Sequence, residues 1–419
     1  MKKVIISGMI GNALEWYDYA LYAQFVSIIS QHFFPDSEIS IILTYAVFAA
    51  GFIVRPVGAV IFGRIGDRLG RRLALAIGIL TMAIPTAAIG LLPSYATIGI
   101  AAPIILTLIR LVQGFSLGGE FSGCIAYIVE SSGKQHRGLA GSAAFVSMCL
   151  GMLFGTLTAA FCREVMDEKT LFDWGWRIPF VAGLLIGLVG LYIRLQLKES
   201  PIYQAAKANG NLSRAPLSDL LKYNMKELLI GMGIYLTVTV PFYIVSVYID
   251  GYMQQIGFSA IDANFANIMT LVCMSITLPI SAHLSDRIGR KPIMIIGCIA
   301  FILFTHPMLW LMNNTESAYV AICAAGFLAT ISGFFMGPVP TVLVELFPTR
   351  VRFTGVALSY NMSAAFFGGT APMMSMILIR TFGDNTILSY YISIFVVLTL
   401  FTLMYYKETF KNSLHDEIR

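Results

Sequence analysis

Runs of about 20 apolar residues recur along the whole chain, and they constrain the fold more than any other feature. A helix of that length crosses roughly 30 Å of hydrocarbon. In lipid, only helices and closed barrels satisfy every backbone polar group, and these runs are continuous rather than alternating. Only 12% of the 419 residues are charged, which is too few to cover the surfaces of soluble domains. The sequence therefore predicts an all-α membrane protein with about twelve transmembrane helices.

The apolar runs define the expected spans, and short polar segments separate them. The spans are residues 5–32, 41–63, 73–92, 99–123, 138–162, 176–197, 227–252, 263–283, 293–312, 317–341, 353–379 and 387–406. The first span follows two lysines, as a signal peptide would, but Glu15 and Asp18 interrupt it and no convincing cleavage site follows. We therefore interpret it as an uncleaved span. The six cysteines lie within or at the edges of apolar runs without metal-ligand spacing, so we expect neither a metal site nor a disulfide.

The basic residues are distributed unequally between the two sides of the membrane. With the N-terminus in the cytoplasm, 21 of the 28 Lys and Arg residues lie in cytoplasmic segments, four on the opposite side and three within spans. The positive-inside rule therefore predicts a multi-pass protein of the cytoplasmic (inner) membrane with both termini in the cytoplasm. This distribution explains the net charge of +5 without a nucleic-acid partner.

Two pairs of similar segments indicate an internal repeat. Asp67, after the second span, and Asp286, after the eighth, lie in similar basic loops and are 219 residues apart. Glu130 and Glu345 open a second pair of similar segments, 215 residues apart. Nearly equal offsets on the same side of the membrane predict two parallel six-helix repeats. The expected domains are an N-terminal bundle over 1–197, a cytoplasmic linker over 198–226 and a C-terminal bundle with a short cytoplasmic tail over 227–419.

These loops and the two-times-six layout resemble the major facilitator superfamily. Three further stretches look like its metabolite:proton symporter branch, namely residues 11–18 (GNALEWYD), 110–120 (RLVQGFSLGGE) and 174–180 (WGWRIPF). Residues 92–99 (LPSYATIG) and the wording of the first span are most similar to proline/betaine transporters. The resemblance implies proton-coupled uptake of a small organic solute, with membrane lipid as surroundings and no cofactor. Sister members carry dicarboxylates and other organic acids.

Several alternatives stay open at this point. The solute could be a carboxylate such as 2-oxoglutarate, citrate or shikimate, and the mechanism could be exchange without protons. Osmosensing relatives can carry a long C-terminal coiled coil, whereas this chain ends about a dozen residues after its last span without heptads, which puts osmotic regulation in doubt. A non-transporting receptor would need a signalling domain, and a pump would need a G-x-x-x-x-G-K-[ST] loop; neither is found, and we expect no enzymatic activity.

Acidic residues at membrane depth are the candidates for proton coupling. A charged residue there costs about 2.5–3.5 kcal/mol, so it marks either a wet site or an ion pair. Glu15 and Asp18 lie three residues apart on one face of the first span, and neighbouring carboxylates disfavour double ionisation, as suits a proton carrier. Glu120 is a further candidate for proton coupling. The alternative is structural: Glu15 and Asp18 could pair with Arg55 or Arg110, and Glu120 could belong to a cytoplasmic gate.

The candidate solute-binding residues are arginines and aromatic or amide side chains within the spans. An arginine fork binds a carboxylate in two places, and proline, betaine and oxo-acids all carry one. An aromatic ring near a cavity could receive a quaternary ammonium group. The candidates are Arg110, Arg55, Gln113, Trp16, Tyr17 and Tyr243.

The residues of the repeated loops are the candidates for gating. An acid at a helix terminus interacts with the helix dipole and with a neighbouring arginine, and breaking such contacts would shift the balance between inward-open and outward-open states. The plain alternative is that these charges only set the topology. The candidates are Asp67, Arg68, Arg71, Arg72, Asp286, Arg287, Arg290, Glu130, Arg137, Glu345 and Arg352.

Overall fold

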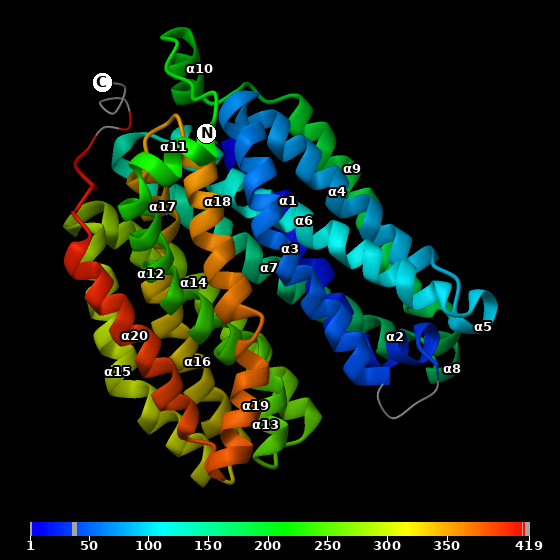
Figure 1. Cartoon of the computed structure of the whole chain (residues 1–419). Coiled ribbons are helices and arrows are strands. Elements are labelled where there is room, and N and C mark those ends of the chain that lie inside the picture. Colours follow the sequence, from blue (N-terminus) through cyan, green and yellow to red (C-terminus); the bar gives the residue numbers. More distant parts are fainter. Residues whose placement is uncertain (1, 36–39, 413, 415–419) are drawn as a thin grey trace.

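The computed structural model describes residues 2–35, 40–412 and 414, and every regular element in that part of the chain is a helix (Figure 1). Each predicted span coincides with one helix or with consecutive helices. In chain order these are α1 (Lys2–Gln24) with α2 (Val26–Phe33), α3 (Ser40–Arg68), α4 (Arg71–Leu91), α6 (Ala101–Glu130), α7 (Arg137–Val165), α9 (Arg177–Leu195), α12 (Met225–Phe242) with η3 (Tyr243–Val247) and α13 (Ile249–Gln255), α14 (Ala260–Ile288), α15 (Arg290–Asn314), α16 (Ala318–Met336) with α17 (Val339–Leu346), α18 (Arg352–Ser363) with η4 (Ala364–Gly368) and α19 (Ala371–Phe382), and α20 (Ile387–Tyr405).

Ten helical segments of the described chain are long and apolar enough to cross a membrane. Together with α1 and α3, they make up the twelve-helix architecture predicted from the sequence. Short helices connect them: α5 (Tyr95–Ile98), η1 (Lys134–His136), α8 (Glu168–Thr170), η2 (Leu171–Gly175), α10 (Pro201–Ala208) and α11 (Pro216–Tyr223).

The helices pack as two bundles, of which the first is on the right and the second on the left in Figure 1. In the first bundle α1 packs on α7, α3 on α6, and α4 on both α6 and α9. In the second, α16 packs on α14 and α15, and α20 on α12 and α15. Two helix pairs form most of the seam between the bundles, α3 against α18 and α7 against α14.

Glycines let the backbones of α3 and α6 approach closely. A Cβ atom on Gly114 would lie 2.0 Å from the carbonyl oxygen of Gly51, and one on Gly118 would lie 2.4 Å from the backbone of Arg55 and Ala59. Membrane helices associate through such small-residue contacts, because lipid offers no hydrophobic driving force between them. The contact fixes the position of Arg55 relative to α6.

One end of the molecule gathers the repeated motifs and both linker helices, and we call it the basic face. It is formed by the last turns of α3, α6 and α14, the first turns of α7 and α18, and the helices α10 and α11 (Figure 1). Asp67 and Asp286, expected in loops, lie instead in the last turns of α3 and α14. Each of them pairs with an arginine four residues ahead, Arg71 or Arg290, at the start of the next helix.

Candidate functional site

Glu15 is a fully buried carboxylate without a partner. Its side chain has no exposed surface, and neither carboxylate oxygen accepts a hydrogen bond from any described residue. Arg55 attracts it electrostatically, yet no ion pair joins the two side chains within the described chain. An ionised carboxylate left unpaired in a low-dielectric interior costs several kcal/mol. The position therefore favours a proton or the cationic group of a ligand.

Arg55 is equally buried and joins the two bundles without meeting an acid. It lies in α3 directly before Pro56, and its guanidinium donates to the hydroxyl of Tyr19 at 2.7 Å. A longer bond of 3.3 Å reaches the hydroxyl of Tyr360 in α18, across the seam. Its Nε–H has no acceptor among the described residues, and the ring of Phe52 lies 3.9 Å from the guanidinium carbon. One edge of the arginine fork is thus incompletely bonded.

Asp18, by contrast, is tied into a hydrogen-bonded network inside the first bundle. It accepts from Arg110 at 2.6 Å and from Gln113 at 3.1 Å, and these two donors come from one face of α6. Gln113 also donates to Thr86 on α4 and accepts from Arg110. The ring of Tyr22 stacks 3.7 Å from the Arg110 guanidinium carbon. The structure therefore brings Asp18, Arg110 and Gln113 together, but as mutual partners.

Glu120 has its own counter-ion in Arg194. The two side chains form a buried, two-pronged ion pair between α6 and α9. Arg194 also donates to the carbonyl of Leu75 on α4. These contacts all lie within the first bundle and hold three of its helices together.

Five aromatic rings close a loop of contacts across the seam. Trp16 packs on Tyr19, Tyr19 on Phe52, Phe52 on Tyr243, Tyr243 on Phe242, and Phe242 on Trp16, with centroids 5.5 to 5.9 Å apart. The first three rings belong to the first bundle and the last two to the second, and all five are buried. We call this set the aromatic loop.

A local break in the seventh span positions one side of the aromatic loop. Pro241 lacks an N–H, and two residues later the helix widens into the π-type turn η3, in which Tyr248 N–H donates to the Tyr243 carbonyl at 2.8 Å. A second π-type turn, η4 of the eleventh span, lies against it, because a Cβ on Gly368 would meet the Tyr243 ring at 2.7 Å. Tyr17 lies elsewhere, since its hydroxyl donates to the carbonyl of Pro179 on α9.

The first contact across the seam at the basic face is made by Asp67. Its carboxylate accepts from the backbone N–H groups of Phe353 and Thr354 at 3.0 and 2.9 Å and from the Thr354 hydroxyl at 2.7 Å. These N–H groups belong to the first turn of α18, where no intrahelical acceptor is available. An acid of the first bundle therefore caps a helix of the second, where the helix dipole favours negative charge.

Asp286 repeats this contact in the opposite sense. It accepts from the N–H groups of Gly138 and Leu139 at 2.8 and 3.0 Å, in the first turn of α7. The equivalent acids of the two repeats therefore each join one bundle to the other, Asp67 from α3 to α18 and Asp286 from α14 to α7.

Ion pairs between arginine and glutamate residues lie beside each of these two helix caps and also cross the seam. Glu130 pairs with Arg71 at 3.0 Å in its own bundle and with Arg352 at 3.2 Å across the seam. Glu345 likewise pairs with Arg290 at 3.4 Å and with Arg137 at 3.7 Å across the seam. In the described part of the chain, no side-chain hydrogen bond or ion pair of the remaining gating candidates crosses the seam. Arg72 donates to the carbonyl of Leu195, and Arg68 and Arg287 have exposed side chains.

Two acids at the basic face were missed in the sequence prediction. Glu199 accepts from the N–H groups of Arg71 and Arg72 at the start of α4, and Glu408 accepts from the N–H of Lys291 at the start of α15. The residues that follow them, Ser200 and Thr409, donate to Glu130 and Glu345. The signal was present in the sequence as Lys-Glu-Ser and Lys-Glu-Thr at residues 198–200 and 407–409, after the sixth and twelfth spans.

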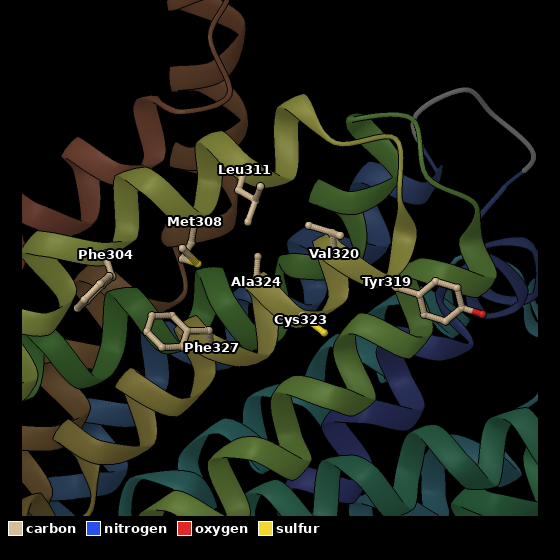
Figure 2. Close-up of a pocket in the computed structure, with 8 residues that line it drawn as sticks. All are labelled: Phe304, Met308, Leu311, Tyr319, Val320, Cys323, Ala324 and Phe327. Carbon is tan, nitrogen blue, oxygen red and sulfur yellow. The ribbon is translucent and has the colours of Figure 1, made fainter.

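An open depression of about 450 Å³ lies between α15 and α16, away from these polar clusters (Figure 2). It carries no charged side chain, and several of its residues are exposed, as expected for a lipid-facing surface. Its lining residues are Phe304, Met308, Leu311, Tyr319, Val320, Cys323, Ala324 and Phe327.

Comparisons with known proteins agree with this architecture. A family model described as Major Facilitator Superfamily matches residues 8–372 and 228–416. The chain is 33% identical to the proline/betaine transporter of Salmonella typhimurium, over 98% of this chain and 84% of that protein. It is also 33% identical to the glycine betaine/proline/ectoine/pipecolic acid transporter OusA of Dickeya dadantii, with the same coverage.

Solved structures of XylE share the fold at low sequence identity. A double-tryptophan mutant of XylE superposes with a TM-score of 0.84 at 20% identity, covering 99% of this chain and 98% of that one. XylE bound to 6-bromo-6-deoxy-D-glucose, described as a proton:xylose symporter, gives 0.82 at 19% identity with the same coverage.

Proposed function

Because the chain belongs to the major facilitator superfamily, and is therefore a multi-pass secondary transporter and not an enzyme, we propose that it imports a small organic solute together with a proton. The relatives' names, proline/betaine transporter among them, favour a zwitterion of the proline or glycine betaine type. The observation that carries the proton coupling is the unpartnered, fully buried carboxylate of Glu15. Without a partner, this carboxylate is stable there only when a proton neutralises it or a cation binds beside it.

The proposed cycle starts from the state in which the basic face is closed. We take the basic face to be cytoplasmic, because it carries most of the Lys and Arg residues. Solute and proton enter from the opposite side and reach the level of Glu15 and Arg55. The bundles then rock, the contacts of Asp67 and Asp286 break, and both ligands leave toward the cytoplasm. The ion pair between Asp18 and Arg110 stays intact while the bundles rock, so that neither of these two buried charges is left without a partner.

Uptake by purified protein in liposomes tests the proposal. An outside-acid pH gradient should drive accumulation of labelled glycine betaine or proline by the wild-type protein. Glu15→Gln mimics the protonated carboxylate permanently, so it should abolish gradient-driven accumulation while leaving solute counterflow. Glu168→Gln, an exposed glutamate outside the spans, is the matched control and should behave as wild type.

Two outcomes would overturn the proposal. Accumulation by Glu15→Gln to the wild-type level under the same gradient would remove Glu15 from the coupling. Counterflow by the wild-type protein without any response to the gradient would make it an exchanger or facilitator, which was the main alternative from the sequence.

A further inference from the structure

Asn12 is a fully buried asparagine of α1 whose two amide hydrogens are both bonded to α7. Its side-chain nitrogen donates to the carbonyl of Ala144 at 2.6 Å and to the hydroxyl oxygen of Ser147 at 2.8 Å. Ser147 donates its own hydroxyl hydrogen to the Ala144 carbonyl at 2.7 Å, so both groups can only accept from Asn12. These two bonds therefore fix the orientation of the amide, with its nitrogen toward α7.

The amide oxygen of Asn12 has no hydrogen-bond donor in this arrangement. It is buried and accepts no hydrogen bond from any described residue. A buried polar atom without a partner costs free energy, and the great majority of such atoms in folded proteins are bonded. Because both amide hydrogens are already used, the side chain can add a bond only as an acceptor.

Glu15 follows Asn12 by three residues in α1. Residues three apart in a helix are neighbours on one face, with about 5–6 Å between their Cβ atoms. Both carboxylate oxygens of Glu15 are buried and accept no hydrogen bond from any described residue. An ionised carboxylate has no hydrogen to offer to an amide oxygen, whereas a protonated carboxyl has one. The two unpartnered groups are therefore complementary only when Glu15 carries a proton.

We propose that the protonated carboxyl of Glu15 donates a hydrogen bond to Asn12 Oδ1, and that Asn12 is the positioning residue that sets the proton affinity of Glu15. This deepens, and rests on, the proposed function as a proton-coupled transporter. The oriented amide stabilises the protonated carboxyl alone, because an amide oxygen repels an ionised carboxylate. Loss of the proton breaks the bond and leaves the carboxylate to the electrostatic attraction of Arg55 on α3.

Other charged and titratable groups act on Glu15 through electrostatics. Two arginines favour its ionised form and two acids oppose it, namely Arg55 on α3, Arg194 on α9, Asp18 on α1 and Glu120 on α6. The remaining groups are a thiol and phenols, which are ordinarily neutral at physiological pH. They are Cys124 on α6, Tyr19 on α1, Tyr235 on α12, Tyr243 in η3 and Tyr360 on α18. Asn12 differs from all of them, because it is uncharged at every pH and acts only through its hydrogen bond.

Infrared difference spectroscopy of the full-length protein in nanodiscs tests the proposal. The carboxyl band that Glu15→Gln removes reports the protonated form of Glu15, and its height against pH gives a titration midpoint. Asn12→Ala removes the acceptor and should lower this midpoint by about 0.5–1 pH unit, which is a ~3-fold to ~10-fold lower proton affinity. Ser147→Ala keeps the acceptor but frees one amide hydrogen to donate to the ionised carboxylate, so it should lower the midpoint by a smaller amount. Ser142→Ala is the matched control and should titrate as wild type, because Ser142 is a buried serine of α7 that donates to the Leu139 carbonyl of its own helix.

The pH profile of uptake into liposomes is the second readout. The external pH that gives half-maximal uptake should move in the acid direction in Asn12→Ala, because a higher proton concentration is then needed to protonate Glu15. A purely structural loss would lower uptake at every pH and leave the profile in place.

The proposal is overturned if Asn12→Ala titrates at or above the wild-type midpoint, or, where that variant does not fold, if Ser147→Ala does so. These failures are separable from those of the proposed function. Gradient-driven uptake with unshifted midpoints would refute the role of Asn12 and leave proton coupling by Glu15 intact. Midpoints that shift as expected, with uptake that ignores the pH gradient, would refute coupling and leave the hydrogen bond between Asn12 and Glu15 intact.

Discussion

Neutralising Asp67 should open the basic face. Its carboxylate accepts three hydrogen bonds across the seam, two from backbone N–H groups of Phe353 and Thr354 and one from the Thr354 hydroxyl. Hydrogen bonds to a charged acceptor contribute about 1.5–3 kcal/mol each and neutral ones about 0.5–1.5 kcal/mol. Asparagine keeps one acceptor oxygen and loses the charge, so Asp67→Asn should weaken the closed state by about 2–4 kcal/mol. That corresponds to a ~30-fold to ~700-fold lower ratio of closed to open protein.

Single-molecule energy transfer across the seam would measure this ratio. Fluorescent unnatural amino acids at the exposed positions of Arg64 and Arg350, near the adjoining ends of α3 and α18, report the separation of the bundles. Asp67→Asn should populate a longer distance and slow uptake, because the return to the closed state becomes limiting. Asp262→Asn is the matched control, since the Asp262 carboxylate accepts from the Ser259 hydroxyl near the start of α14, within its own bundle. Distance distributions that are identical in Asp67→Asn and wild type would refute the assignment of Asp67 as a lock.

Two further predictions concern stability. Glu120→Gln or Arg194→Gln should each lower the free energy of unfolding by about 3–5 kcal/mol, because one buried charge is left unpaired, whereas the double variant should lose less than the sum. Additive losses in thermal unfolding would contradict the pairing. Gly114→Ala should destabilise the protein by about 1–3 kcal/mol, because its Cβ would overlap the Gly51 carbonyl, while Gly133→Ala, with nothing within 4 Å, should be neutral in the same assay.

The architecture could be predicted because its signals are local and repeated. Hydropathy alone defined the spans, and the two pairs of basic segments defined the repeat, so Asp67 and Asp286 were found as equivalent residues before their partners were visible. Glu199 and Glu408 form a third pair of equivalent residues, one in the linker and one in the tail. The sequence similarity around them covers only three residues, which is too short to indicate a repeat by itself. Their roles as helix caps could not be predicted, because a cap depends on which helix start lies nearby in space.

The candidate site was less predictable, because pairing between spans is a tertiary property. Glu120 was a candidate for proton coupling or gating, but the sequence could not indicate its ion-pair partner Arg194, which lies 74 residues away. Only part of the aromatic loop could be predicted. Trp16 and Tyr243 were candidate binding residues, whereas Phe52 is one of 29 phenylalanines in the chain and nothing in the sequence distinguishes it. In a helix that is apolar on all sides, hydropathy does not indicate which face meets the other bundle.

The distribution of charge between the bundles bears on how such a transporter can switch. Among the described residues, the fully or nearly fully buried charges of the second bundle are confined to the basic face, at Arg290, Glu345 and Arg352. At the level of the aromatic loop the seam is closed by ring contacts, by the long bond from Arg55 to Tyr360 and by a bond from the Asn361 amide to the Gly118 carbonyl. Ring contacts contribute about 0.5–1.5 kcal/mol each and a hydrogen bond from the charged Arg55 about 1.5–3 kcal/mol, whereas the basic face places several charged caps and ion pairs across the seam. A solute that binds at this level therefore acts where fewer charged contacts join the bundles, because a ligand that contacts both bundles shifts the equilibrium most easily when few existing contacts must be replaced.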